Sequence, residues 1–216
     1  MKQDRITIHD QYAAQYDAAV IEYGNYDAEI VFGLSYEFVH PQESLLDIGI
    51  GTGLGSQHFA RAGLDIFGVD GSAAMLQVCR AKGFAKELKQ FDLEQNPWPY
   101  ADASFNHAIA CGLFHFFGDL APLFAEVARL VEPEGIFAFT VMSDSATISQ
   151  EDRQRGFSED TGSEITIYRH SADYLDTLLT ATGFTRLKLV KFLVWSGRGD
   201  QDNLFHACVA RKLSPE

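Results

Sequence analysis

Cysteine is scarce in this sequence of 216 residues. The three cysteines, Cys79, Cys111 and Cys208, are odd in number and show no paired spacing. Two of them, Cys79 and Cys111, stand in apolar segments, where a free thiol behaves as a small hydrophobic group. The sequence therefore predicts no disulfide framework and no bound metal, and its cysteine usage suits a reducing compartment.

The sequence also has fewer positive than negative charges, and it has no long apolar run. The 17 Lys and Arg residues face 30 Asp and Glu residues, for a formal net charge of -13, whereas nucleic-acid affinity depends on Lys and Arg contacts to phosphate. No stretch approaches the roughly 18 apolar residues of a membrane helix, and residues 1–5 form no apolar signal core. We therefore expect a cytoplasmic protein that uses neither nucleic acid nor a membrane as its partner.

Hydrophobic residues are plentiful enough for one large core, at 46% of the chain and with 17 Phe, so residues 1–216 are predicted to form a single domain. Short apolar runs alternate with helical periodicity, the pattern of βαβ units. This alternation predicts an α/β fold with a doubly wound, Rossmann-like parallel sheet. The expected strands of this sheet are Ser44–Gly49, Ile66–Asp70, Leu88–Asp92, Phe105–Cys111 and Gly135–Val141.

Other segments surround this predicted cofactor-binding core, residues 44–141. Residues 1–40 carry apolar and aromatic side chains at helical spacing and are predicted to form an N-terminal helical cap. Residues 143–170 begin with a polar stretch too long for an ordinary connection, so we interpret them as a lid insertion. Residues 171–212 predict a helix followed by a β-hairpin.

The residues that indicate chemistry begin with Asp47 and the glycines Gly49, Gly51 and Gly53. Here an apolar strand ends in glycines that open a helix, so the backbone can turn tightly and approach a ligand without a Cβ in the way. The loop is neither a dinucleotide fingerprint, which needs glycine where Leu54 stands, nor a P-loop. A carboxylate at Asp47 would repel a pyrophosphate but suits a ligand with cationic groups. A tight turn that binds nothing is the alternative.

Two further acids end the next predicted strands. Asp70 lies about twenty residues beyond the loop, where a carboxylate hydrogen-bonds ribose hydroxyls, and Asp92 ends the third strand. Each acid alone could be a helix cap or a solvated strand end. Together they point to one ligand site, because open α/β sheets bind ligands outside the carboxyl ends of adjacent strands.

With these motifs the chain resembles the class I S-adenosylmethionine-dependent methyltransferases, especially the small-molecule type 11 group. The resemblance covers about Tyr12 to Val141 and Tyr168 to Phe184, although Glu134 replaces a family glycine in the turn before the fifth strand. It implies S-adenosylmethionine as cofactor and S-adenosylhomocysteine as product. The residues that match the family's cofactor positions are Asp47, Gly49, Ile50, Gly51, Gly53, Asp70, Gly71, Met75, Asp92, Leu93, Cys111 and Gly112.

The resemblance also implies a seven-stranded sheet whose last strand is antiparallel and inserted beside its predecessor. The expected reaction is methyl transfer to a small-molecule acceptor by in-line displacement, in which the protein mainly aligns the reacting atoms. A base is optional; were one used, His115 follows the fourth strand, where the methyl group should point, and an ordinary histidine pKa suits it. Stacking on the cofactor or packing under the lid is the alternative for this histidine.

Residues outside the core are expected to complete the site. Tyr12 and Tyr16 of the cap are predicted to close over the cofactor, although an aromatic stripe on a helix is often core. The candidates for the acceptor pocket are His115, Phe116, Tyr168, His170 and Trp195. Structural packing is the alternative for the last three.

Two other functions stay open from the sequence. A nicotinamide-dependent oxidoreductase would share the sheet and the ribose-binding acid, but Asp47 and Leu54 argue against it. A catalytically silent module that binds the cofactor for regulation or assembly has the same motifs as an enzyme. The sequence indicates neither the acceptor, nor the atom methylated, nor the oligomeric state.

Overall fold

The computed structural model describes residues 5–144, 149–162, 165–194 and 203–214. Its centre is a seven-stranded sheet of order β3-β2-β1-β4-β5-β9-β8. The strands are β1 (Ser44–Ile48), β2 (Asp65–Asp70), β3 (Ala85–Gln90), β4 (His107–Ala110), β5 (Ile136–Met142), β8 (Phe184–Val194) and β9 (Asn203–Lys212). Strands β1 to β5 pair in parallel, whereas β9 lies antiparallel between β5 and β8. The predicted α/β sheet with an antiparallel last strand is confirmed.

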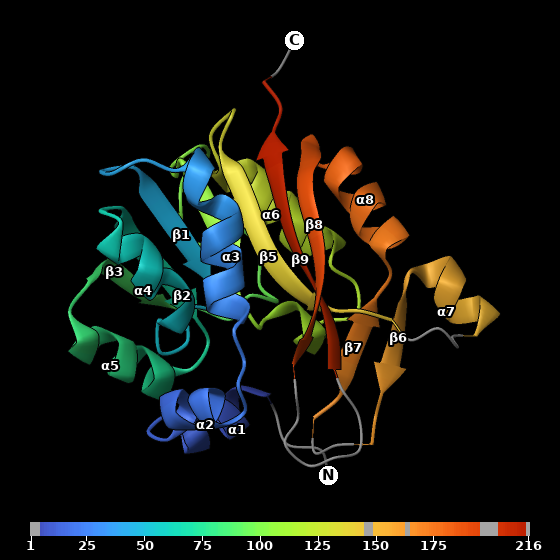
Figure 1. Cartoon of the computed structure of the whole chain (residues 1–216), viewed down its shortest axis with the longest axis horizontal. Coiled ribbons are helices and arrows are strands. Elements are labelled where there is room, and N and C mark those ends of the chain that lie inside the picture. The colour runs from blue at the N-terminus through green and yellow to red at the C-terminus, as the bar shows by residue number, and fades with distance from the viewer. Residues whose placement is uncertain (1–4, 145–148, 163–164, 195–202, 215–216) are drawn as a thin grey trace.

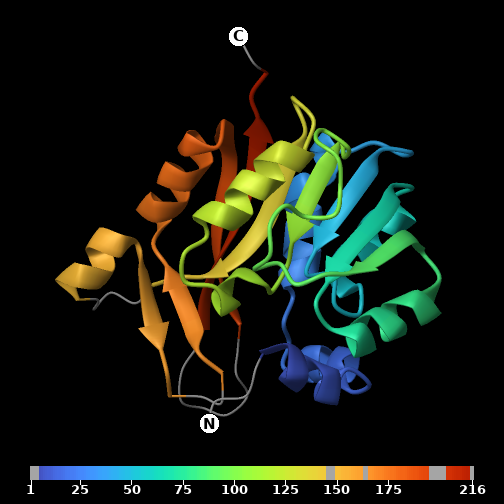
Figure 2. The same cartoon turned by 180° about the vertical axis from the view of Figure 1, so that it is seen from behind.

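Helices pack on both faces of this sheet (Figures 1 and 2). One face is covered by α3 (Asp27–Ser35), α4 (Leu54–Arg61) and α5 (Ala73–Lys82), and the other by α6 (Ala121–Leu130) and α8 (Ala172–Ala181). Short 3₁₀ helices, η1 (Tyr36–Phe38) and η2 (Phe114–Phe116), follow α3 and β4. This layering is what a parallel sheet requires, because both of its faces must be buried.

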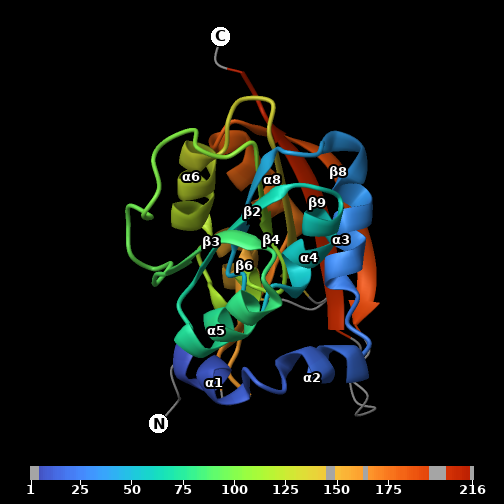
Figure 3. The same cartoon turned by 90° about the vertical axis from the view of Figure 1, so that its left-hand side faces the viewer.

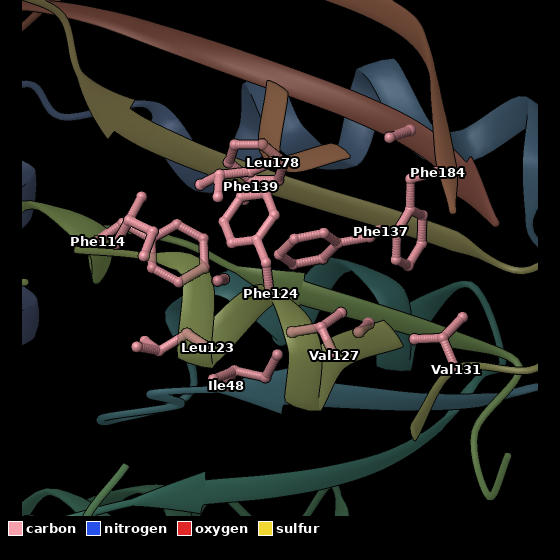
Figure 4. Packing of buried hydrophobic residues seen from close by; sticks show 14 of the residues in the cluster. Ile48, Phe114, Leu123, Phe124, Val127, Val131, Phe137, Phe139, Leu178 and Phe184 are labelled. Carbon is pink, nitrogen blue, oxygen red and sulfur yellow. The ribbon is translucent and has the colours of Figure 1, made fainter. Parts of the chain in front are cut away.

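Alternation along the strands divides the interior into two hydrophobic cores. Leu46 and Phe137 belong to the core under α6 and α8, whereas their neighbours Leu45 and Ile136 belong to the core under α3 and α4. Successive side chains of a strand point to opposite faces of the sheet, which produces this division. In the first core aromatic rings meet edge to face, as Phe124 does with Phe137 at 5.4 Å (Figure 4).

Helix ends follow the expected capping chemistry. The Ser72 hydroxyl accepts a hydrogen bond from the Met75 N–H at 3.1 Å, and Gly83, with φ 71°, ends α5 in the left-handed conformation. Ser171 caps α8 in the same way, accepting from Tyr174 N–H at 3.1 Å. Both helices therefore begin at a serine N-cap, and α5 also ends at a left-handed glycine.

Two strand boundaries differ from prediction. The third strand, expected at residues 88–92, is β3 at Ala85–Gln90, and the fourth, expected at residues 105–111, is only His107–Ala110. β3 is an edge strand with exposed Glu87 and no buried residue, so it carries little apolar periodicity. The prediction followed the apolar residues just after β3 and therefore placed the strand a few residues too late.

The predicted N-terminal cap is smaller than residues 1–40. Only α1 (Arg5–Tyr12) and α2 (Tyr16–Glu22) lie across the carboxyl ends of the parallel strands (Figure 3). Helix α3 instead packs on the sheet beside α4 and is part of a layer. The Asp27 to Ser35 segment buries an apolar stripe against β5 and β9, which explains its place in the core.

The segment predicted as a lid insertion contains regular structure. Helix α7 (Gln150–Arg155) precedes a two-stranded antiparallel sheet, β6 (Phe157–Asp160) and β7 (Ile167–His170), at the same end of the molecule as the cap (Figure 1). The ring of Phe157 contacts Tyr168 of the paired strand and Tyr174 of α8, and the second contact holds the hairpin to the domain. In the described part of the chain, no helix combines the length and apolar character needed to cross a membrane.

Candidate functional site

A cavity of about 380 Å³ lies at the carboxyl ends of the parallel strands, under the N-terminal cap. Its walls come from the segments that follow β1, β2, β3 and β4, and from α1, α2 and the start of α3. This volume is in the usual range for small-molecule sites. The sequence-based expectation of a site at this edge of the sheet therefore agrees with the cavity's position.

The three glycines of the loop after β1 have different surroundings. Gly49 (φ 68°) and Gly51 (φ 54°) line the cavity, and a Cβ on Gly49 would lie 2.6 Å from Leu113 Cδ1. A Cβ on Gly51 would meet no atom closer than 3.9 Å, so its Cα faces open space. Gly53 (φ 87°) does not line the cavity; a Cβ there would lie 2.6 Å from Phe84 Cζ. Gly49 and Gly53 therefore permit close packing with Leu113 and Phe84, while Gly51 leaves its backbone open to a ligand.

Asp47 lies beneath the loop and does not line the cavity. Its side chain is buried, at 2% exposure, and its Oδ2 has no hydrogen-bond partner among the described residues. Burial, together with the nearby charges of Asp70 and Asp27, raises the pKa of Asp47 to about 7. A cation at this end of the cavity would stabilise its ionised form.

Asp70, at the end of β2, lines the cavity and also holds the loop. One carboxylate oxygen accepts a hydrogen bond from Gly51 N–H and the other from Ser72 N–H, both at 2.8 Å. Burial raises the pKa of Asp70, and these two hydrogen bonds lower it. Each oxygen keeps a second lone pair for a ligand hydroxyl.

The end of the cavity beside β2 and β3 brings together five further residues that match the family's cofactor positions. Ile50, Gly71, Met75, Asp92 and Leu93 all line it. Two cap residues that the sequence did not indicate complete this end. Ile6 approaches Gly71 so closely that a Cβ there would lie 2.7 Å from Ile6 Cδ1, and Arg5 pairs with Asp92 at 3.8 Å.

Cys111 and Gly112 line the cavity directly after β4. Gly112 has φ 63°, and its N–H donates to Thr140 Oγ1 on β5 at 2.9 Å. Burial raises the pKa of the Cys111 thiol well above its usual range. Cys111 is therefore a neutral wall of the cavity and a poor nucleophile.

The two cap tyrosines lie in different places. Tyr16 lines the cavity, and burial raises its pKa, with Asp27 and Asp70 contributing next. Tyr12 is 58% exposed and does not line the cavity. His9, one turn before it, does line the cavity and meets the ring of Phe116 edge to face at 5.0 Å. Helical spacing alone could not tell which residues of α1 face inward.

The residues predicted around an acceptor are not all brought to the cavity. Phe116 lines it, but His115, on the adjacent position of η2, does not. Burial lowers the pKa of His115 to about 3, and its Nδ1 has no hydrogen-bond partner among the described residues. A histidine this weakly basic is poorly suited to removing a proton at neutral pH.

Two other acceptor candidates, Tyr168 and His170, lie in strand β7 of the hairpin. His170 is buried, stacks on Tyr174 and places Nε2 2.9 Å from the Gly118 carbonyl oxygen. Tyr168 packs against Phe157, and neither Tyr168 nor His170 lines the cavity. His170 therefore holds the hairpin against the domain, while Tyr168 packs within the hairpin. The fifth candidate, Trp195, lies outside the described residues.

Sequence reasoning missed Asp27, a buried acid at the first position of α3 that lines the cavity. An acid in the first turn of a helix is common, because it interacts favourably with the helix dipole. Its position beside the end of β4 depends on tertiary packing, so no local pattern singles it out.

Comparisons with known proteins agree with this geometry. A family profile described as "Methyltransferase domain" matches residues 46–139, which span the glycine loop, both strand-end acids and Cys111. Residues 46–139, less than half of the chain, are therefore similar to a methyltransferase domain. The predicted cofactor-binding residues from Asp47 to Gly112 all lie within this matched segment.

Curated proteins similar to this chain differ in what their names say they act on. The chain is 32% identical over 104 residues to a malonyl-[acyl-carrier protein] O-methyltransferase of Serratia marcescens, covering 48% of this chain and 40% of the relative. It is 28% identical over 93 residues to a demethylmenaquinone methyltransferase of Tropheryma whipplei strain Twist, covering 43% and 39%. The matched segment thus spans about two fifths of the length of these curated relatives.

A solved structure supports this α/β fold over most of the chain. The structure of a SAM-dependent methyltransferase from Methanosarcina mazei superposes with a TM-score of 0.69 at 17% identity. The match covers 84% of this chain and 98% of that chain. At this identity the likeness establishes the fold alone.

Proposed function

We propose that the chain transfers the methyl group of S-adenosylmethionine to a small-molecule acceptor. The observation that carries this proposal is that one cavity joins the glycine loop, Asp70 and the Cys111–Gly112 segment. The resemblance implies that the loop and the Cys111–Gly112 segment contact the methionine part of one cofactor and that Asp70 binds its ribose. Their convergence on a single space fits a single extended ligand.

The charges at the cavity fit a cationic ligand. Asp27, Asp47 and Asp70 are buried or partly buried there, and within the described ranges none forms an ion pair with Lys, Arg or His. Uncompensated carboxylates would repel a pyrophosphate, so the cavity disfavours a nicotinamide dinucleotide. They would attract the ammonium and sulfonium groups of S-adenosylmethionine.

The protein's contribution to the reaction is alignment. When bound, S-adenosylmethionine supplies a methyl group already activated by its sulfonium. Asp70 would hold the ribose, while the backbone at Gly49 and Gly112 would hold the methionine part on either side of the β1–β4 junction. Tyr16 and Phe116, which both line the cavity, would exclude water from the methyl group.

The acceptor is proposed to be a small molecule, in keeping with the net charge of -13, which disfavours nucleic acid. The named relatives act on a malonyl thioester carrier and on demethylmenaquinone, which offer a carboxylate and a ring acceptor. Leu113 and Phe116 give the cavity an apolar wall that either chemistry could use. We further propose that the chain works in the cytoplasm.

The proposal is tested by incubating the chain with S-adenosylmethionine and a panel of carboxylic acids, phenols, quinols and amines. Formation of S-adenosylhomocysteine that depends on one acceptor class supports methyl transfer and names the class. The Asp70→Ala variant should form product more slowly at subsaturating cofactor, because its cofactor binding is weakened. Firm cofactor binding without product for any acceptor would favour the silent binding module instead.

A further inference from the structure

Asp27 is a carboxylate of the cavity that no family motif explains. It is 7% exposed, lines the cavity and begins α3. Its Oδ1 accepts a hydrogen bond from Ala28 N–H at 2.8 Å. Its Oδ2 faces the segment after β4, where a Cβ on Gly112 would lie only 3.3 Å away. Asp27 therefore sits against the strand end that borders the predicted methionine site.

The groups around Asp27 offer no positive charge. The titratable groups that feel its charge are Tyr16 of α2, Asp47 of β1 and Cys111 after β4, and its own helix adds Glu29. All of these are neutral or negative, and no Lys, Arg or His of the described residues pairs with it. A carboxylate this buried is costly to ionise without a cationic partner.

Asp27 and Asp47 occupy the same end of the site. Asp47 lies under the loop after β1, Asp27 lies against Gly112 after β4, and these two strands are neighbours in the sheet. Asp70, at the end of β2, lies on the other side of β1. A ligand whose ribose reaches Asp70 would extend its opposite end toward Asp27.

We propose that Asp27 binds the α-amino group of the cofactor's methionine part and so ties the start of α3 to the ligand. This inference rests on the proposed function, since it assumes that S-adenosylmethionine occupies the cavity. It adds a residue that precedes the matched family segment, residues 46–139. The amino group supplies the positive charge that the surrounding side chains lack.

If Asp27 binds the amino group, the affinity for the ligand should depend on the protonation of Asp27 and so on pH. Burial raises the pKa of Asp27 to about 6, while Glu29 raises it further and hydrogen bonds from Ala28 and Thr140 lower it. An aliphatic amino group stays protonated over this range, so it favours the ionised carboxylate. Affinity for ligands that carry the amino group should therefore fall as the pH drops from 8 to 5.5.

The experiment compares Asp27→Asn with Asp17→Asn by calorimetry. Asp17 is a matched control on the cap, because it accepts a hydrogen bond from Thr52 Oγ1 at 2.5 Å and pairs with Lys82 without lining the cavity. The two ligands are S-adenosylhomocysteine, which carries the amino acid part, and 5′-methylthioadenosine, which lacks it. Both are measured at pH 7.5 and at pH 5.5 with each variant and with the unaltered chain.

We expect Asp27→Asn to weaken S-adenosylhomocysteine binding at least tenfold and 5′-methylthioadenosine binding less than twofold. Asp17→Asn should weaken both ligands by the same factor. Equal losses of the two ligands in Asp27→Asn, or no loss of either, would overturn the inference. Failure of the unaltered chain to bind S-adenosylhomocysteine would instead overturn the proposed function.

Discussion

Among single residues, a comparison of Gly51 with Gly83 distinguishes the effect of a side chain on ligand binding from its effect on the backbone. Both have a left-handed φ, 54° and 71°, and an added Cβ meets nothing closer than 3.9 Å at Gly51 and nothing within 4 Å at Gly83. Only Gly51 lines the cavity. A side chain at either position incurs a similar backbone strain, on the order of 1–2 kcal/mol.

We therefore expect Gly51→Val to lower S-adenosylhomocysteine affinity more than tenfold, while Gly83→Val binds normally. Thermal unfolding should show similar destabilisation of the two variants, which makes calorimetric affinity the distinguishing measurement. If Gly51→Val binds as well as Gly83→Val, the loop after β1 is only a turn.

Asp70→Ala tests the ribose assignment. The change removes an acceptor for ligand hydroxyls and the hydrogen bond from Gly51 N–H, so binding should weaken by roughly 1.5–3 kcal/mol, the range for hydrogen bonds to a charged group. Asp65→Ala is the control. Asp65 begins the same strand, forms an ion pair with Lys86 at 3.3 Å and does not line the cavity. Unchanged affinity in Asp70→Ala would contradict the assignment.

The sequence could predict those site residues that belong to a local sequence pattern, and it could not predict those that reach the site only through folding. Gly51, Asp70 and Gly112 stand in local strand-end patterns, so they could be found without knowing the fold. Asp27 and His9 reach the cavity only because α1, α2 and α3 fold back over the strand ends, and no local pattern marks that contact. The sequence also could not show that His115 is buried away from the cavity while its neighbour Phe116 lines it, because this too depends on tertiary packing.

At the scale of elements, the cap is fastened across the cavity by polar contacts. Asp10 of α1 accepts hydrogen bonds from Ser72 Oγ at 2.5 Å and Ala74 N–H at 3.2 Å, at the start of α5. Asp17 of α2 accepts one from Thr52 in the glycine loop. These contacts join the cap to the segments that would hold the cofactor, as expected for a lid.

Hydrogen exchange should therefore slow in α1 and α2 when S-adenosylhomocysteine binds, because the ligand would bridge the cap and the sheet. The β6–β7 hairpin, none of whose described residues lines the cavity, should not respond to this ligand alone. We expect the hairpin to slow only when an acceptor is also present. Exchange in the cap that is identical with and without ligand would show that the cap is not a lid.

Prediction of the elements succeeded where burial imposes a pattern and failed where it does not. β1 and β5 are buried on both faces and were found within a residue or two. The edge strand β3 was placed too late, because Lys86, Glu87 and Lys89 interrupt its apolar residues. The β6 sequence, Phe157–Asp160, is mostly polar, and its pairing depends on the contact of Phe157 with Tyr168.

Across the whole molecule, the buried acids and the buried histidines give the free energy of unfolding opposite dependences on pH. The pKa values of Asp47, about 7, and Asp27, about 6, lie above 3.8, so between these values the folded state keeps protons that the unfolded state releases. Their contribution to the unfolding free energy falls as pH rises from 4 to 7. The pKa values of His115, about 3, and His170, about 4, lie below 6.5, so their contribution falls as pH drops below 6.5.

Asp47→Asn should accordingly stabilise the free protein while impairing the site. At pH 8 the unfolding free energy should rise by roughly 1–3 kcal/mol, because a buried, unpaired negative charge is removed. At pH 4.5 the gain should be much smaller, since the folded protein then holds Asp47 protonated. Denaturant unfolding at both pH values measures this; destabilisation at pH 8 would show that the carboxylate has a compensating partner.

The central claim is that this cavity accepts S-adenosylmethionine and its product and rejects nicotinamide dinucleotides. Isothermal titration calorimetry of the unaltered chain with S-adenosylhomocysteine and, separately, with reduced nicotinamide adenine dinucleotide tests it most directly. The account predicts saturable binding of S-adenosylhomocysteine at one site per chain and no heat of binding for the dinucleotide. Binding of the dinucleotide with no response to S-adenosylhomocysteine would contradict it.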